Sequence, residues 1–330
     1  MTHEPRAPLP RRTLIALGVC ALAACALPLP ALAQGGKVVR FILPNATGSG
    51  VDAITRTAQA ALGKALGFPV VVENQPGAGG ILGVQAIARA APDGMTLGVV
   101  SNNVVIFPSV YKTLPFDLGT DITPIAIVGT TPMVLVVNPK VAAANSKELV
   151  ALMKARPGQI NYGSGGNGTI LHLATAMYLD EAGVSALHVP YKGVGPMVSD
   201  LIGGQIEMAT AALPSVQQHL KSGALRAIGV TTAQRVAAAP EIPTFVEQGL
   251  AGYVVDAWFA VIGPKGMAAA DVKRVHDALV AAFADPAVAE AMARQGNVIS
   301  VGSSDSAQQY FRTELAKYAR LVKKAGIEQQ

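Results

Sequence analysis

The fold is decided by residues 38–52, which read VVRFILPNATGSGVD. Val38–Leu43 is an apolar run rich in branched side chains, which predicts a buried strand. Pro44–Gly50 interrupts this run, and Asp52 begins an amphipathic helix that extends to Ala65. A strand, a glycine-bearing loop and a helix in this order are the first half of a βαβ unit, which is typical of an α/β fold.

The same alternation continues along the chain. Further strands are predicted at Pro69–Val72, Thr96–Val100, Ile160–Tyr162, Leu187–Pro190, Ile206–Leu213 and Leu225–Thr231. Such units predict parallel sheets with helices on both faces. Ile122–Asn138 is long and apolar with Gly129 and Pro132 in its middle, so we expect two strand segments joined by a bend. This segment would carry the chain into a second domain, and Val254–Ile262 would carry it back.

Length and composition set the class of protein. The chain has 330 residues, which favours two domains or one large α/β domain. Apolar residues make up 51% and charged residues 14%, a composition that supports buried cores and not disorder. The formal net charge is +5, and it falls to +3 without the three basic residues and the one acid of the first 33 positions. This charge is too weak and scattered to predict a nucleic-acid partner.

The first 33 residues are expected to be a signal peptide. Arg11 and Arg12 form a positive start, Thr13–Leu27 is an apolar run, and Ala31–Ala33 is a small-x-small cleavage site. The apolar run is short for a membrane span, so we expect export and a periplasmic location.

Two alternatives remain for this segment. Arg11-Arg12 loosely resembles a twin-arginine signal, and Leu22–Cys25 resembles a lipoprotein processing box, so lipidation at Cys25 is an alternative. Both cysteines, Cys20 and Cys25, lie here, so the mature protein would have none. Disulfides, thiolate catalysis and cysteine zinc sites are then excluded.

Gly163–Gly168 contains the pattern G-x-G-x-x-G between a predicted strand and a predicted helix. A dinucleotide site would need an acid about twenty residues later, where this chain has His188. Glycines also allow close approach of the backbone, and N–H groups at a helix start hold an anion. A carboxylate site, a structural turn and a dinucleotide site are therefore all open interpretations.

The first loop, Asn45–Asp52, repeats this arrangement. Its N–H groups and the Ser49 hydroxyl can donate to a carboxylate. Asp52 either caps its helix or also accepts from a ligand amine or a bridging water. Neither loop carries Arg or Lys, so a carboxylate held here is held by the backbone and by water.

Patterns of catalytic residues are not found in the sequence. Neither Ser49 nor Ser164 lies in G-x-S-x-G. The four histidines of the mature chain are dispersed and form no metal-binding pattern; they are His172, His188, His219 and His276. We therefore expect no enzyme, no catalytic residue, no metal and no cofactor. His172, one turn into its helix, is either a hydrogen-bonding partner that orients the helix or a neighbour of the ligand.

Several stretches together resemble the bacterial tripartite tricarboxylate transporter receptors, also called the Bug family. The resemblance extends from about residue 37 to residue 328 and rests on residues 72–80 (VENQPGAGG), 91–94 (APDG), 108–112 (PSVYK), 161–168 (NYGSGGNG) with His172, 188–193 (HVPYKG), 203–205 (GGQ) and 225–228 (LRAI).

The resemblance implies the type II periplasmic binding protein fold, in which two α/β domains enclose a ligand cleft and are joined by crossing strands. We expect domain 1 at residues 34–137 plus 254–330 and domain 2 at residues 138–253. The implied ligand is a di- or tricarboxylate, an amino acid or a nicotinate-like acid. It would lie between Thr47–Asp52 and Gly165–Thr169, with His172 behind. The implied partners of a monomeric receptor are membrane subunits of the transporter or a membrane sensor.

The ligand-binding residues expected on this basis are Asn45, Thr47, Gly48, Ser49, Gly50, Val51, Asp52, Ser101, Asn102, Gly165, Asn167, Gly168, Thr169, His172, Tyr191, Lys192, Leu213 and Asp256. The chain departs from the family pattern at Asn45, Thr47, Val51, Asn102–Asn103 and Ala211–Ala212. Since the backbone supplies the carboxylate site, these changes bear on the far end of the pocket, where Asp256 and Trp258 are expected. A sensory co-receptor of the same fold is the alternative function, and an exported hydrolase or NAD-dependent enzyme is a weaker one.

Overall fold

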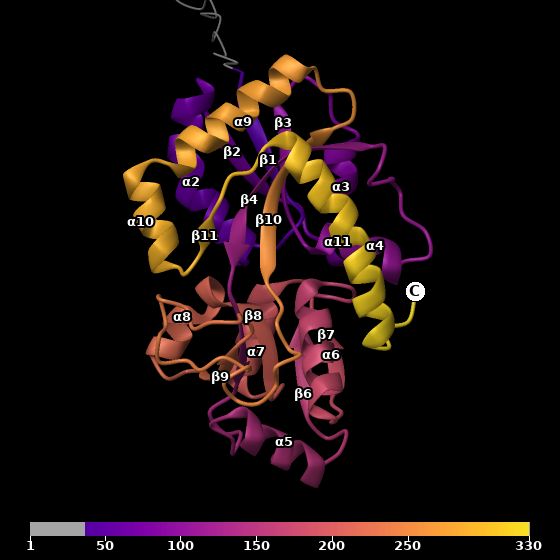
Figure 1. Ribbon diagram of the computed structural model, residues 1–330, viewed down its shortest axis with the longest axis vertical. Helices are drawn as coiled ribbons and strands as arrows, with labels where there is room; N and C mark the ends of the chain where they lie inside the picture. The colour runs from indigo at the N-terminus through magenta and orange to yellow at the C-terminus, as the bar shows by residue number, and fades with distance from the viewer. Residues whose placement is uncertain (1–36, 330) are drawn as a thin grey trace, which may run out of the picture. The chain divides into compact units, whose positions relative to one another are not determined.

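Two sheets carry the fold in the computed structural model, which describes residues 37–329 (Figure 1). The predicted signal peptide and Cys25 lie outside these residues. The first sheet has the strand order β11 (Val298–Ile299), β4 (Ile122–Thr131), β10 (Ala257–Pro264), β3 (Thr96–Ser101), β1 (Val39–Leu43), β2 (Val70–Asn74). The second has the order β7 (Leu187–Pro190), β6 (Asn161–Ser164), β8 (Met208–Ala212), β5 (Met133–Val137), β9 (Arg226–Val230).

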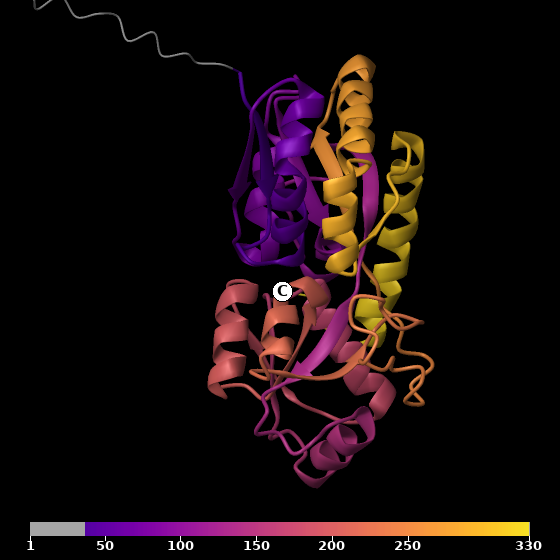
Figure 2. The same ribbon diagram turned by 90° about the vertical axis from the view of Figure 1, so that its left-hand side faces the viewer.

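Each sheet has its own helices, and we call a sheet with its helices a lobe. The first lobe contains α2 (Gly50–Leu66), the short 3-10 turn η1 (Ala78–Gly80), α3 (Ile81–Ala88), α4 (Asn103–Val110), α9 (Ala269–Phe283), α10 (Pro286–Arg294) and α11 (Ser304–Lys324). The second lobe contains α5 (Ser146–Ala155), α6 (Ile170–Ala182), α7 (Val194–Gly203) and α8 (Leu213–Lys221). Figure 2 shows the two lobes from the side.

Strand direction follows the route of the chain. β1 is parallel to β2 and β3, and β6 is parallel to β7 and β8, as the βαβ pattern predicts. The prediction of purely parallel sheets is wrong for the strands next to the crossings. β10 is antiparallel to β3 and β4, and β5 is antiparallel to β8 and β9, because these strands enter from the other lobe and not through a crossover helix.

The predicted bend between the lobes is confirmed. β4 ends at Thr131, β5 begins at Met133, and Pro132 alone separates them. The second crossing returns through β10, which pairs with β4 along its whole length. Figure 1 shows both segments running between the two sheets. The predicted division into residues 34–137 plus 254–330 and residues 138–253 stays a prediction, since Lys37–Gln330 pack as one compact unit.

Two helices, α4 and α8, were not predicted from the sequence. α4 reads NVVIFPSV and is buried along most of its length, so it has no polar face to reveal a helical period. α8 begins at Leu213, where the sequence predicted the end of a strand. Pro214 at the second helical position ends the strand and starts the helix, because its fixed φ suits a first turn.

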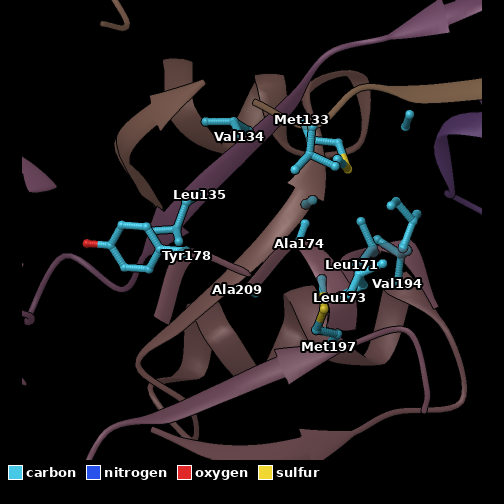
Figure 3. Close-up of a cluster of buried hydrophobic side chains, with 14 of the residues drawn as sticks. Met133, Val134, Leu135, Leu171, Leu173, Ala174, Tyr178, Val194, Met197 and Ala209 are labelled. Carbon is cyan, nitrogen blue, oxygen red and sulfur yellow. The ribbon is translucent and has the colours of Figure 1, made fainter. Parts of the chain in front are cut away.

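The core of the second lobe surrounds β5. All five residues of this strand, MVLVV, are buried, as expected for a central strand covered on both faces. Figure 3 shows Met133, Val134 and Leu135 of β5 among the side chains of α6, α7 and β8. The first lobe has an equivalent core under α2 and α9, where Phe41, Ile54 and Leu279 are almost fully buried.

α11 connects the lobes on their outer side. It packs against β4 and α4 of the first lobe and reaches α6 of the second, where Lys324 Nζ lies 3.4 Å from an oxygen of Asp180. Within residues 37–329, none of the helices combines the length and the apolar character needed to cross a membrane.

Candidate ligand-binding cleft

A cavity of about 710 Å³ lies between the two lobes, and we call it the cleft. Its walls include Pro44–Ala46 and Pro76–Gly80 of the first lobe and Pro190–Val194 of the second. Its volume falls in the range of about 300 to 1,000 Å³ that is usual for small-molecule sites.

Six helices present their first residues or caps to this cleft. The lining includes Ser49 before α2, Gly80 before α3, Asn103 at the start of α4, Thr169 before α6, Gly193 before α7 and Ala212 before α8. Each helix start carries a partial positive charge and N–H groups without helical acceptors. The only lining side chain with a full charge is that of Lys192, among residues 37–329. The cleft therefore attracts anions mainly through its backbone.

The first loop is fixed by its own hydrogen bonds. Ser49 Oγ accepts from the Asp52 N–H at 3.2 Å, and Asp52 Oδ2 accepts from the Gly48 N–H at 3.0 Å. Asp52 Oδ1 accepts from Arg56 Nε at 2.8 Å and from Asn74 Nδ2 at 3.0 Å. The Asp52 carboxylate is thus bonded within the protein and does not line the cleft.

The same bonds leave two donors unused at the start of α2. Within the described part of the chain, the N–H groups of Gly50 and Val51 have no hydrogen-bond acceptor, and both residues line the cleft. Ser49 lines it as well, and its hydroxyl can donate a proton while its oxygen accepts from Asp52. These three groups form a compact set of donors for one carboxylate.

Asn74 ties this loop to the next one. Its Nδ2 donates to Asn45 O and to Asp52 Oδ1, both at 3.0 Å, and only Gln75 separates it from the turn Pro76–Gly80 in the cleft wall. We expect Asn74→Ala to lower the free energy of unfolding by about 1–2 kcal/mol, because the two bonds of its Nδ2 and the bond that its Oδ1 accepts from Arg56 Nη2 are lost. Urea unfolding measures this change, with Gln59→Ala, which removes one bond to Val70 O, as the control. Equal losses in the two variants would contradict a special role for Asn74.

The glycine-rich loop of the second lobe, Gly165–Thr169, faces the turn Gly77–Gly80. A Cβ placed on Gly79 would lie 3.1 Å from Asn167 O, and one placed on Gly166 would lie 3.6 Å from Gly79 Cα. The first distance is shorter than a usual contact, so a side chain at Gly79 would push the two loops apart, whereas the second is an ordinary contact.

Hydrogen bonds also cross between the lobes at this end of the cleft. Tyr111 donates its hydroxyl to Asn167 O at 3.1 Å, and Asn103 Oδ1 accepts from the Ile170 N–H at 2.8 Å. At the opposite wall, a Cβ on Gly193 would lie 2.4 Å from Ala46 Cβ, and one on Gly50 would lie 3.0 Å from Ala212 Cβ. The lobes are therefore in contact on both sides of the cleft.

A stack of three rings supports the glycine-rich loop from behind. The His172 and His188 ring centroids are 3.8 Å apart and nearly parallel, and Tyr162 stacks on His188 at 4.9 Å. His188 Nε2 is 2.7 Å from Ser164 Oγ, and His172 Nδ1 accepts from the Gly168 N–H at 3.4 Å. Burial, with repulsion from His188, lowers the pKa of His172 to about 3, and burial lowers the pKa of His188 to about 4.

The structure brings many of the predicted site residues to the cleft. Those that line it are Asn45, Ser49, Gly50, Val51, Ser101, Gly165, Asn167, Thr169, Tyr191 and Lys192. Trp258, expected at the far end of the pocket, also lines it, and its indole N–H donates to Glu314 at 2.8 Å.

Other predicted site residues lie outside the cleft lining: Thr47, Gly48, Asp52, Asn102, Gly168, His172, Leu213 and Asp256. Thr47, Gly48 and Asp256 are exposed, and Leu213 is in the core. Asn102 is fully buried, where its Oδ1 accepts from the Trp258 N–H and its Nδ2 donates to Tyr318 and to Asp256 O. These bonds hold the end of β3 against the start of β10.

Several lining residues were missed in the sequence. The turn Pro76–Gly80 follows β2 at the same sheet edge as the first loop. Its position after a parallel strand could therefore have indicated that it lines the ligand site. Thr131, Met133, Tyr111 and Val194 also line the cleft. Thr131 and Met133 lie at the crossing between the sheets, and no local pattern marks them.

Comparisons with known proteins agree with this architecture. BugT of Bordetella pertussis is 33% identical over 320 residues, which cover 96% of this chain and 98% of that protein. The structure of the periplasmic binding protein BugD is 32% identical, with a TM-score of 0.85 over 89% of this chain and 99% of the other. The structure of R. palustris Rpa4515 with adipate is 28% identical, with a TM-score of 0.85 over 88% of this chain and 98% of the other.

The family match covers most of the chain. Residues 54–327 match the family described as tripartite tricarboxylate transporter family receptor. The type II periplasmic binding protein fold, predicted from the same resemblance, is confirmed by the two sheets, their crossing strands and the related structures. The chain belongs to the tripartite tricarboxylate transporter receptor family.

Proposed function

We propose that this receptor binds a small carboxylate outside the cytoplasm and delivers it to a tripartite tricarboxylate-type transporter. As a member of this family the chain is a solute-binding receptor and not an enzyme. The observation that carries the proposal is the convergence of six helix starts on a cleft in which, among residues 37–329, one lining side chain is charged. A small anion is the ligand that this arrangement stabilises best.

Within the cleft, the proposed carboxylate lies at the start of α2. Ser49 Oγ and the N–H groups of Gly50 and Val51 would bind its oxygens, and the lobes would close over it. From the second lobe, Asn167 and Thr169 line the opposite wall. The walls also include the apolar side chains of Met133, Leu171 and Val194, which suit the carbon chain of an organic acid. The related R. palustris structure, solved with adipate, supports a ligand of this class.

Location and partners follow from the same relatives. BugD is described as a periplasmic binding protein, and we propose the same location for this chain after removal of residues 1–33. The proposed partners are membrane subunits of the transporter. A membrane sensor is the second candidate partner, and pull-down of membrane proteins with the closed, ligand-bound receptor distinguishes the two.

Ligand screening tests the function. We expect at least one di- or tricarboxylate, amino acid or nicotinate at millimolar concentration to raise the melting temperature, because a ligand that binds only the folded state stabilises it. Isothermal titration then gives the affinity. The amide of the same compound, in which the carboxylate charge is removed, is the control and should bind far more weakly. A protein that none of these acids stabilises would contradict the proposal.

A further inference from the structure

The start of α6 is capped from both lobes. Thr169, the residue before the helix, accepts from the His172 N–H through its Oγ1 at 3.4 Å. The N–H of Ile170, the first residue of α6, donates to Asn103 Oδ1 of the first lobe at 2.8 Å, and this bond is buried. The first N–H groups of a helix have no helical acceptor. A side chain of the first lobe therefore supplies the acceptor that a helix of the second lobe lacks.

Both ends of α4 hold the same loop of the second lobe. Asn103 is the first residue of α4, and Tyr111, which directly follows its last residue, donates to Asn167 O at 3.1 Å. Between them, Val110 packs on the glycine-rich loop, since a Cβ on Gly168 would lie 2.9 Å from Val110 Cγ1. The Tyr111 bond is only partly buried, so water can replace it, whereas the Asn103 bond is shielded from water.

The start of α2 differs from that of α6 at the matching position. Gly50 is the first residue of α2, and among the described residues its N–H has no acceptor. Ile170 is the first residue of α6, and its N–H is bonded to Asn103. A ligand oxygen can therefore bind at α2 without displacing a protein group, whereas at the Ile170 N–H it would have to displace Asn103.

We propose that Asn103 is a positioning residue that couples ligand binding to lobe closure by capping α6 when the lobes meet. This inference rests on the proposed function. When the lobes separate, water can accept from the Ile170 N–H; when they meet, the bond is buried and Asn103 is the acceptor. Without this acceptor the closed form alone contains an unpaired buried N–H, which is costly. The closed, ligand-bound form is then less populated than in the wild type.

Asn103→Ala tests the proposal in the full mature chain. The probe is the tightest binder among adipate, succinate, malate and nicotinate, measured by isothermal titration. We expect Asn103→Ala to bind it about three- to thirtyfold more weakly, since a buried helix cap is lost. The matched control is Asn145→Ala, because Asn145 caps α5 within the second lobe, where its Oδ1 accepts from the Glu148 N–H at 2.9 Å. This control should leave the affinity unchanged.

Asn103 also lines the cleft, so a second pair of variants removes the same bond from the donor. Ile170→Pro lacks the N–H, and proline suits the first position of a helix. Thr169 before it has the extended backbone that proline requires, with φ −79° and ψ 157°. Ile170→Ala loses the same side chain but keeps the N–H. We expect the proline variant to bind about three- to thirtyfold more weakly than the alanine variant, and both to bind alike once Asn103→Ala is added.

Melting temperatures without ligand provide the other readout. We expect a smaller fall for Asn103→Ala than for Asn145→Ala, and an equal fall would overturn the coupling, since the bond would then stabilise the protein whether or not the ligand is bound. Binding by Asn103→Ala within twofold of the wild type would overturn this inference and leave the proposed function standing. Equal affinities of Ile170→Pro and Ile170→Ala would also overturn it, because Asn103 would then not act through α6. A wild type that binds none of the four acids would overturn both.

Discussion

Gly50→Val is expected to weaken ligand binding by about 10- to 100-fold while the ligand-free protein stays folded. Gly50 is the first residue of α2, and a Cβ there would lie 3.0 Å from Ala212 Cβ of the second lobe. A branched side chain would hold the lobes apart, and overpacking of this kind costs about 1–3 kcal/mol. The backbone at Gly50 has an ordinary negative φ, so the substitution introduces no strain of its own. Isothermal titration measures the loss.

The matched control is Gly203→Val, because a Cβ on this helical glycine meets nothing within 4 Å. A second comparison shows whether the new side chain weakens binding by holding the lobes apart or by occupying the space of the ligand. Gly50→Ala should weaken binding less than Gly50→Val, and Ala212→Gly added to Gly50→Ala should recover most of the loss, since it removes the opposing methyl group. If Ala212→Gly recovers nothing, the contact between the lobes does not limit binding.

Acidification from pH 7.5 to pH 5 is expected to lower the free energy of unfolding by about 2–4 kcal/mol through His172 and His188. The pKa of each histidine in the folded protein, about 3 and about 4, is below the usual value of 6.5. Between these values the unfolded chain binds protons that the folded chain does not. Their contribution to stability is therefore full above about pH 6.5 and is lost as the pH falls toward the folded pKa values.

Urea unfolding at the two pH values tests this effect. We expect His172→Gln and His188→Gln each to reduce the pH dependence by about half, while His219→Gln, outside the ring stack, leaves it unchanged. Ligand affinity should also fall at low pH, because both rings hold the glycine-rich loop through Ser164 and Gly168. Asp180 and Glu328 line a cavity next to the two histidines. Variants in which these carboxylates are neutral therefore test whether they, and not the histidines, cause the pH dependence. An unchanged pH dependence in both histidine variants would contradict the assignment.

Much of the fold could be predicted because each lobe begins with strands whose apolar runs are followed by glycine-bearing loops. The bend at Pro132 could also be predicted from local sequence, because Gly129 and Pro132 interrupt the long apolar segment Ile122–Asn138. The direction of β5 and β10 could not, because it depends on which lobe the chain comes from. α4 was missed because a helix buried along most of its length shows no amphipathic period.

The site shows the same division between local and long-range information. Ser49, Gly50 and Thr169 belong to strand-to-helix loops, and the sequence places such loops at one edge of a sheet. Asn102 and Leu213 lie next to the same edge, but their side chains turn into the core, where Asn102 bonds to β10. The Asp52 carboxylate accepts hydrogen bonds from Gly48 of its own loop and from Asn74, and it does not line the cleft. Side-chain direction depends on partners far away in sequence, which a single chain does not reveal.

The six helix starts that meet at the cleft have a consequence for redesign of this receptor. Main-chain amides are present at every residue except proline, so a single exchange to any other residue leaves the attraction for an acid group in place. Met133, Leu171 and Val194 in the walls can then be varied to fit acids with longer, shorter or aromatic carbon skeletons. The scaffold thus separates recognition of the charge from recognition of the body of the molecule, which suits it as a starting point for sensors of different organic acids.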